Sequence, residues 1–304
     1  MNEQGILLES GTNELELLAV LVNDQLFGMN VAKVQSIQQC DRKLVTKLPK
    51  EMPGVSGMFL YRDKTIPLMD LAQILEIKIT QKIEREIIVV TEFNNSINSF
   101  KVQGVKRIYR LSWKELEPFD KTFGNNDYFI GSVNIENSQI LIIDLEHILS
   151  EIFPNLIIED VSESIIQKQE TVTRDKLEIL FADDSPTIRK GVGKALKVAG
   201  FKNVTDFENG EVALKYIQEK YNGKEEQDFD NVVLISDIEM PRMDGLTLCK
   251  NIKQNPKLKN LYTIMFSSLI NKQMIKKCEN VKADTCITKP ETNQLINLLD
   301  ARCQ

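Results

Sequence analysis

The chain has 304 residues, enough for two domains of ordinary size, and its 42% hydrophobic and 27% charged residues are typical of folded globular proteins. The formal net charge of −6 argues against a broad nucleic-acid-binding surface. No stretch is apolar for long enough to span a bilayer, and residues 1–5 lack the basic start of a signal peptide, so we expect a cytoplasmic protein without direct membrane insertion.

The cysteines and the single histidine argue against several kinds of site. Since the five cysteines lack paired spacing, we expect free thiols in a reducing cytosol and neither disulfides nor a zinc site. They are Cys40, Cys249, Cys278, Cys286 and Cys303. His147 lies within a hydrophobic helix pattern, which favours a partly exposed structural role over a catalytic triad.

The first half of the chain reads as a β-rich domain that follows a loose tail over residues 1–12. Short strands are predicted at residues 15–22, 25–29, 55–61, 65–71, 86–93, 99–105 and 139–145. Residues 31–37 have helical or mixed spacing, residues 44–49 an extended one, and residues 72–75 fit a short helix. Pro67 indicates an edge strand or a bulge. Many short strands with regular turns predict a small barrel or a pair of barrels.

One block of this half carries a resemblance to a known family. Residues 57–71 contain Gly57, Arg62 and the run Pro67-Leu68-Met69-Asp70-Leu71, and they resemble the signature of the CheW adaptor family. Residues 128–149 resemble the family's final strand and helix, so the resemblance covers about residues 13–153. It implies a domain over residues 13–155 with two small β-barrel subdomains that couples chemoreceptors to the histidine kinase CheA.

The resemblance also implies a partner surface. The family's receptor-contacting surface maps to Arg62 and to the segment before the second hairpin, at about Val34 and Ile37. From the residues alone, Arg62 is equally well an exposed arginine in an ordinary turn, and the strand spacing indicates no partner.

Residues 156–175 join the two halves. The stretches 159–163 and 167–171 are polar and contain neither Gly nor Pro, which leaves a frayed helix or a disordered tether as alternatives.

From residue 176 to residue 304 the rhythm changes to alternating strands and helices, which predicts a parallel sheet with helices on both faces. Strands are predicted at residues 177–182, 204–207, 232–236, 261–267 and 283–288, and helices at 185–199, 211–221, 246–254, 272–279 and 291–301. Five such units match a flavodoxin-like α/β fold with strand order 2-1-3-4-5.

Polar residues follow four of these strands: Asp183-Asp184, Asp237, Ser267 and Lys289. The carboxyl ends of parallel strands share one edge of the sheet, where such folds bind ligands. Carboxylates held close together need a counter-charge, which Mg²⁺ and a lysine supply. An Asp nucleophile, a cation, a lysine and a hydroxyl together predict a site for a phosphoryl group.

The order of these residues resembles the receiver domain of two-component response regulators. The resemblance implies that Asp237 is the phosphoacceptor and that Ser267 and Lys289 contact the phosphoryl oxygens. It gives Mg²⁺ four ligands: Asp183 through water, Asp184, Asp237 and the backbone carbonyl of Glu239.

Two positions depart from the receiver pattern. Cys286 stands where receivers often carry an aromatic switch residue, which puts the usual coupling of phosphorylation to the distal face in doubt. The carboxylate of Glu239 falls where it affects hydrolysis of the phosphoryl group, in a direction that the sequence does not give. The bond between Lys289 and Pro290 is one that permits a cis peptide.

A CheW-like domain followed by a receiver, with no further domain expected after residue 301, resembles the CheV-type chemotaxis coupling proteins. The first hypothesis is an adaptor that binds CheA and methyl-accepting chemotaxis proteins at receptor arrays and is modulated by phosphorylation of Asp237. The alternative is a phosphate sink that drains CheA. The acidic balance argues against a transcriptional regulator, and the single histidine against a conventional enzyme, so we expect slow self-dephosphorylation at most.

Overall fold

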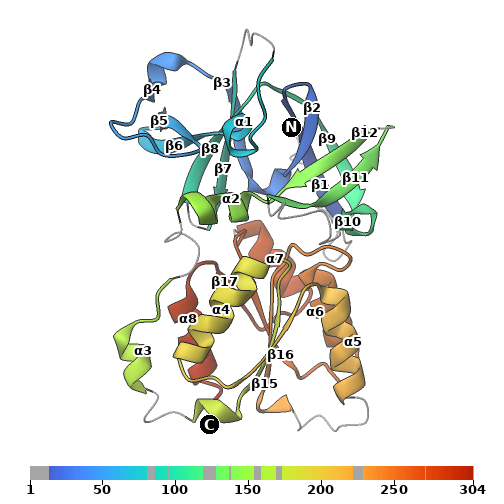
Figure 1. The fold of residues 1–304 in the computed structure, drawn as a ribbon. Coiled ribbons are helices and arrows are strands. Elements are labelled where there is room, and N and C mark those ends of the chain that lie inside the picture. Colours follow the sequence, from blue (N-terminus) through green and yellow to red (C-terminus); the bar gives the residue numbers. More distant parts are fainter. Residues whose placement is uncertain are drawn as a thin grey trace, which may run out of the picture. The chain divides into compact units, whose positions relative to one another are not determined.

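The computed structural model describes residues 14–80, 86–94, 96–118, 128–136, 138–153, 159–168, 173–221, 229–270 and 272–303. The chain divides into two compact units: an N-terminal unit, Leu15–Ile157, and a C-terminal unit that contains Ile158–Gln304. Figure 1 shows the strands and helices of both units.

The N-terminal unit is built on two six-stranded sheets. The first sheet has the order β10-β11-β12-β2-β1-β9, with β1 (Glu14–Val22), β2 (Gln25–Asn30), β9 (Gly104–Ser112), β10 (Glu117–Pro118), β11 (Phe129–Ile135) and β12 (Ser138–Ile143). The second has the order β3-β7-β8-β6-β5-β4, with β3 (Val34–Gln39), β4 (Val45–Thr46), β5 (Val55–Tyr61), β6 (Lys64–Asp70), β7 (Ile87–Phe93) and β8 (Ser96–Val102). Helices α1 (Leu71–Ile74) and α2 (Leu145–Ile152) follow β6 and β12. The predicted all-β class is confirmed.

Two tight turns set the register of the predicted hairpins. Asn23 and Asp24 join β1 to β2 with φ angles of 46° and 64°, and Arg62 and Asp63 join β5 to β6 with φ angles of 45° and 64°. Two consecutive residues with positive φ match the twist of antiparallel strands. Both turns therefore place alternate apolar side chains of their strands in the core.

Two predictions for this unit are corrected, and three strands were missed. Residues 31–37 are not helical throughout, because only Val31–Lys33 form a 3₁₀ turn, and β3 pairs with β7 along its length. This long-range pairing overrides the weak local pattern. Pro67 lies in β6, between β8 and β5, so the edge alternative is wrong. Pro67 pairs with Met58, and the register shift of this hairpin lies between Val55 and Gly57 of β5. Strands β9, β10 and β11 were not predicted from the spacing of apolar residues.

The C-terminal unit has a parallel five-stranded sheet with the order β14-β13-β15-β16-β17, which confirms the predicted order 2-1-3-4-5. Its strands are β13 (Glu178–Ala182), β14 (Asn203–Phe207), β15 (Val232–Ser236), β16 (Tyr262–Ser267) and β17 (Thr285–Thr288). Its helices are α4 (Pro186–Val198), α5 (Gly210–Tyr221), α6 (Gly245–Gln254), α7 (Lys272–Asn280) and α8 (Thr292–Asp300). Helices α4 and α8 lie on one side of the sheet, and α5 and α6 on the other (Figure 1).

The segment before β13 also belongs to this unit. Its described part contains helix α3 (Glu163–Gln167) and a 3₁₀ turn, Arg174–Lys176. The joining segment was predicted to be either a frayed helix or a disordered tether, and its described part contains a short helix.

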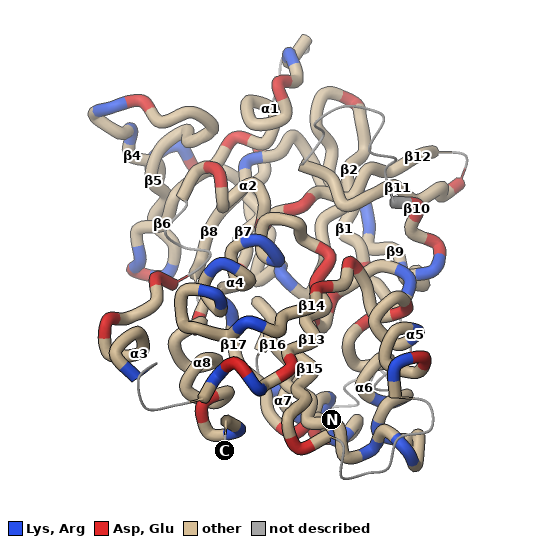
Figure 2. Tube along the Cα trace, turned by 60° about the horizontal axis from the view of Figure 1, so that its bottom comes forward, with Lys and Arg blue, Asp and Glu red and all other residues tan. Residues whose placement is uncertain are grey.

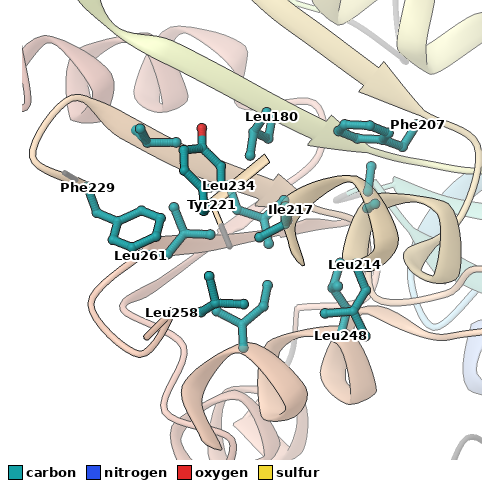
Figure 3. Close-up of a cluster of buried hydrophobic side chains, with 14 of the residues drawn as sticks. Leu180, Phe207, Leu214, Ile217, Tyr221, Phe229, Leu234, Leu248, Leu258 and Leu261 are labelled. Carbon is teal, nitrogen blue, oxygen red and sulfur yellow. The ribbon is translucent and has the colours of Figure 1, made fainter. Parts of the chain in front are cut away.

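A hydrophobic core of this unit lies between the sheet and helices α5 and α6 (Figure 3). Buried side chains from three strands and two helices meet there, among them Leu180, Leu234, Ile217, Tyr221 and Leu248. All five residues of β15 are buried, so the central strand is covered on both faces.

Acidic and basic residues are interspersed along much of the described trace, whereas helix α4 carries basic residues and no acidic one (Figure 2). None of the helices within the described ranges is both long enough and apolar enough to cross a membrane.

The core predicts a stability effect confined to one unit. Leu248 is fully buried, so we expect Leu248→Ala to lower the free energy of unfolding of the C-terminal unit by about 3 kcal/mol through lost transfer energy and a cavity. Urea unfolding separates the units, because the only tryptophan, Trp113, reports on the N-terminal core by fluorescence, while circular dichroism follows the helices.

The matched control is Val212→Ala on α5, where the side chain is 38% exposed. It should change the free energy of unfolding by less than about 0.5 kcal/mol. An equal loss in both variants would contradict the assignment of Leu248 to the core.

Candidate functional site

The carboxyl ends of the parallel strands bring the predicted polar residues together. Asp183 and Asp184 follow β13, Asp237 follows β15, Ser267 ends β16, and Lys289 follows β17. One carboxylate oxygen from each of the three aspartates lies within 4.8 Å of the others. The sheet thus assembles residues that are more than a hundred positions apart in the chain.

Lys289 is the cation of this cluster. It is 1% exposed, and its Nζ atom lies 2.7 Å from Oδ2 of Asp183 and 2.8 Å from Oδ2 of Asp237. Burying ionised groups is unfavourable unless they are paired with good geometry. The lysine therefore compensates the two aspartates that are themselves buried.

Backbone groups fix the second oxygen of each buried carboxylate. Oδ1 of Asp183 accepts a hydrogen bond from the N–H of Ser185 at 2.9 Å, and Oδ1 of Asp237 accepts one from the N–H of Ile238 at 2.6 Å. Hydrogen bonds to charged acceptors are the strong ones in proteins. Both side chains are consequently held in one orientation.

Ser267 contributes a hydroxyl without a partner. Its Oγ atom is buried and makes no hydrogen bond to any described residue. An unmade hydrogen bond of a buried polar group costs about 1–3 kcal/mol. A ligand oxygen bound beside Ser267 would satisfy this hydroxyl.

The loop after β15 closes tightly on Asp237. A Cβ atom at Gly245 would lie 1.9 Å from the carbonyl oxygen of Asp237, so only glycine fits there. Asp244 caps α6 by accepting from the N–H of Thr247 at 2.6 Å, and burial raises the pKa of Asp244. Gly245 is not among the residues predicted for the site, although its place eight residues after Asp237, at the start of α6, was visible in the sequence.

The residues present fit a magnesium ion. Mg²⁺ prefers carboxylate and carbonyl oxygens and keeps several waters, and Asp183, Asp184 and Asp237 offer a converging set of carboxylates. With one lysine against three aspartates, the cluster retains an excess of negative charge when ionised. The carbonyl ligand at Glu239, which is half-buried on the loop, stays a prediction.

Cys286 occupies the position where receivers often carry an aromatic switch residue, and its small thiol cannot swing between buried and exposed positions as an aromatic ring does. It is half-buried on β17 and packs, with the buried Cys278, against the cluster that contains Ile238 and Leu246. A hydrogen bond from the Cys278 thiol lowers the pKa of Cys286.

The residues predicted for the partner surface lie in the second sheet of the N-terminal unit. Ile37 is 44% exposed on the edge strand β3, where Val34 is half-buried. Arg62 is exposed in the β5–β6 turn, with its guanidinium 5.1 Å from the centre of the Tyr61 ring. In the sheet order β7 and β8 separate β3 from this hairpin, so hydrogen bonding does not bring the three residues together.

Both units match known families. Residues 16–153 match the CheW-like domain, and residues 179–300 match the response regulator receiver domain. The chain is thus a two-domain signalling protein in which a CheW-like domain precedes a receiver.

Relatives match nearly the whole chain. It is 32% identical over 286 residues to the chemotaxis protein CheV3 of Helicobacter pylori, which covers 90% of this chain and 89% of that protein. It is 27% identical over 289 residues to CheV2 of the same organism, again covering 90% and 89%. The chain belongs to the CheV family of chemotaxis proteins, and it is a chemotaxis coupling adaptor with a receiver domain.

Solved structures resemble each half. The scaffolding protein TtCheW from Thermoanaerobacter tengcongensis is 20% identical, with 44% of this chain and 92% of that chain covered and a TM-score of 0.41. The chemotaxis protein CheY4 of Vibrio cholerae is 28% identical, with coverage of 42% and 98% and a TM-score of 0.35.

The acid cluster predicts a stabilising effect of magnesium. At about ten times its dissociation constant, Mg²⁺ should raise the free energy of unfolding of the C-terminal unit by about 1.4 kcal/mol, because it binds the folded site alone. Asp184→Asn should remove most of this gain. Thermal melts with Mg²⁺, or with choline chloride at equal ionic strength, measure it.

Asp230→Asn, which changes an exposed aspartate outside the cluster, is the control and should keep the full response. If Asp184→Asn responds to Mg²⁺ as the native protein does, the cation binds elsewhere.

Proposed function

We propose that Asp237 accepts a phosphoryl group from the phosphohistidine of CheA, and that this modification modulates coupling by the N-terminal unit. The observation that carries the proposal is the buried triad of Asp183, Asp237 and Lys289 beside the unpartnered hydroxyl of Ser267. A nucleophile, a cation and a free donor within one edge of a sheet suit phosphoryl transfer.

The residues have distinct roles in this transfer. A carboxylate oxygen of Asp237 attacks the phosphorus atom, and the P–N bond of the phosphohistidine breaks with its electron pair leaving on the imidazole. Lys289 moves from the carboxylates to the equatorial phosphoryl oxygens, and Ser267 donates a hydrogen bond to one of them. Mg²⁺ bound by the aspartates would neutralise charge on the phosphoryl group.

The N-terminal unit is proposed to bind chemoreceptors (methyl-accepting chemotaxis proteins) and CheA, which would recruit the protein to receptor arrays. Large apolar side chains are exposed on or beside its second sheet, namely Ile37, Leu44, Met52 and Leu60. Ile37 lies on the β3 edge of this sheet, and the other three lie on or beside β4 and β5 at the opposite edge. Exposed apolar side chains at these edges are candidates for interaction sites. Arg62, Val34 and Ile37 are the proposed contacts.

The phosphate-sink alternative receives less support. A sink needs only the receiver, whereas the relatives match both units over 89% of their own length. The adaptor is therefore the function that we propose.

Transfer from phosphorylated CheA tests the phosphoacceptor. With labelled CheA and Mg²⁺, Asp237→Asn should lower the rate of label transfer at least about a hundredfold, because the amide is not a competent nucleophile. Asp230→Asn should transfer at the native rate, and binding of either variant to receptors should stay unchanged. Equal transfer to Asp237→Asn would assign the phosphoacceptor elsewhere.

Co-sedimentation with receptor-containing membranes and CheA tests the surface. Ile37→Asp should weaken binding about tenfold or more, since it puts a charge where an apolar contact is proposed. Arg62→Ala should weaken it less, by removal of one contact.

Ile108→Asp is the matched control, because Ile108 is 51% exposed on β9 of the other sheet. If Ile108→Asp weakens binding and Ile37→Asp does not, the proposed surface is wrong.

A further inference from the structure

The segment that leads from the N-terminal unit to the receiver is tied along helix α8. We call its described residues, 159–168 and 173–176, the strap. The strap contacts three polar residues of α8, Asn293, Asn297 and Asp300, which are spaced so that they lie on one face of the helix. It is therefore packed on the receiver and is not a tether free of it.

The first tie is at the start of α8. This helix has no side-chain cap of its own, and the N–H of Asn293 donates to Oε2 of Glu159 at 3.1 Å. The Asn293 side chain closes the tie, because Oδ1 accepts from the N–H of Ser162 at 2.9 Å and Nδ2 donates to the carbonyl of Asp160 at 2.9 Å. A carboxylate at a helix N-terminus is favoured by the free N–H groups there. The strap thus supplies the cap that α8 lacks.

The second tie is at the end of α8. The guanidinium of Arg174 is buried and forms two hydrogen bonds to the carboxylate of Asp300, at 2.6 and 2.7 Å. It also donates to the carbonyls of Ile165 and Ala199. Between the ties, the Ile165 side chain is 2% exposed. A paired, buried arginine of this kind fixes the strap to α8 and α4 at one point.

The first tie lies close to the phosphorylation site along the chain. Lys289 is separated from Asn293 by three residues, and this short connection is hydrogen-bonded and packed, because the N–H of Glu291 donates to the carbonyl of Thr288 at 3.0 Å and Thr292 is buried. In the described state, Lys289 is held by Asp183 and Asp237. The position of the first turn of α8 is consequently linked to the groups that Lys289 binds.

We propose that the strap transmits the state of the phosphorylation site: when Lys289 leaves the carboxylates for a phosphoryl group, α8 shifts at its start and the tie through Asn293 and Glu159 loosens. This inference rests on the proposed function of Asp237. It needs no aromatic switch, and Cys286 on β17 supplies none. Asn293 and Glu159 act as positioning residues, because neither touches the reacting atoms.

Hydrogen–deuterium exchange of the full chain, with and without beryllofluoride and Mg²⁺ as the phosphoryl mimic, tests the proposal. Beryllofluoride should slow exchange in peptides over residues 232–245, which reports that the site is filled, and should speed exchange over residues 159–168 about threefold or more. If residues 232–245 are protected but exchange of the strap is unchanged or slower, the proposed role of the strap is wrong and the phosphoacceptor assignment stands. An unprotected site overturns the phosphoacceptor assignment and the strap with it.

Asn293→Ala removes two of the three hydrogen bonds of the first tie. In this variant the strap should exchange rapidly even without beryllofluoride, and beryllofluoride should raise the exchange rate of the strap little further. Protection of residues 232–245 by beryllofluoride should be as in the native chain. Gln294→Ala, at the exposed neighbouring position on the same helix, is the matched control and should respond like the native chain. Glu159→Ala gives a second test outside the receiver's own helices and strands, with the same result expected. A native strap response in both Asn293→Ala and Glu159→Ala overturns the proposal.

Discussion

The ion pairs of Lys289 are the interaction on which the receiver site depends. Two aspartates that are buried at adjacent strand ends would repel each other without a cation, and the lysine lies within 2.8 Å of an oxygen of each. The strand order makes this possible, since β17 is separated from β15 only by β16 and the long lysine side chain spans that strand. Ser267 ends β16, which lies between the strand followed by Asp237 and the strand followed by Lys289. The chemistry of the site is thus a consequence of the sheet topology.

This arrangement is also unbalanced. One lysine faces three aspartates, and hard cations are attracted to such an excess of carboxylate oxygens. A cation on the aspartates would weaken the hold of Asp183 and Asp237 on Lys289, because it competes for the same oxygens. The lysine would then be available to an incoming phosphoryl group. One side chain therefore stabilises the unliganded fold and takes part in the proposed reaction.

The sequence predicted the receiver better than the N-terminal unit, for physical reasons. Strands β13, β15 and β16 are short buried runs that lead into polar residues, and β17 leads into Lys289. The order of Asp237, Ser267 and Lys289 was therefore readable along the chain. The sheets of the N-terminal unit have exposed stretches: β3 alternates half-buried and exposed residues, and β9 carries Lys106 and Arg107 in an exposed run. Such strands are specified by their neighbours more than by their own composition.

The segment that joins the units shows the same limit. Its polar run resembles a solvated linker, because the groups that bind it come from a helix about 130 positions later in the chain. One signal was present: Asn293, Asn297 and Asp300 give α8 a polar face beside the apolar one that packs on the sheet. A second polar face on a short terminal helix is also what solvent exposure produces, so only the structure assigns it a partner. With Cys286 unable to move as a ring does, the backbone from Lys289 into α8 is the direct physical connection between the site and this segment.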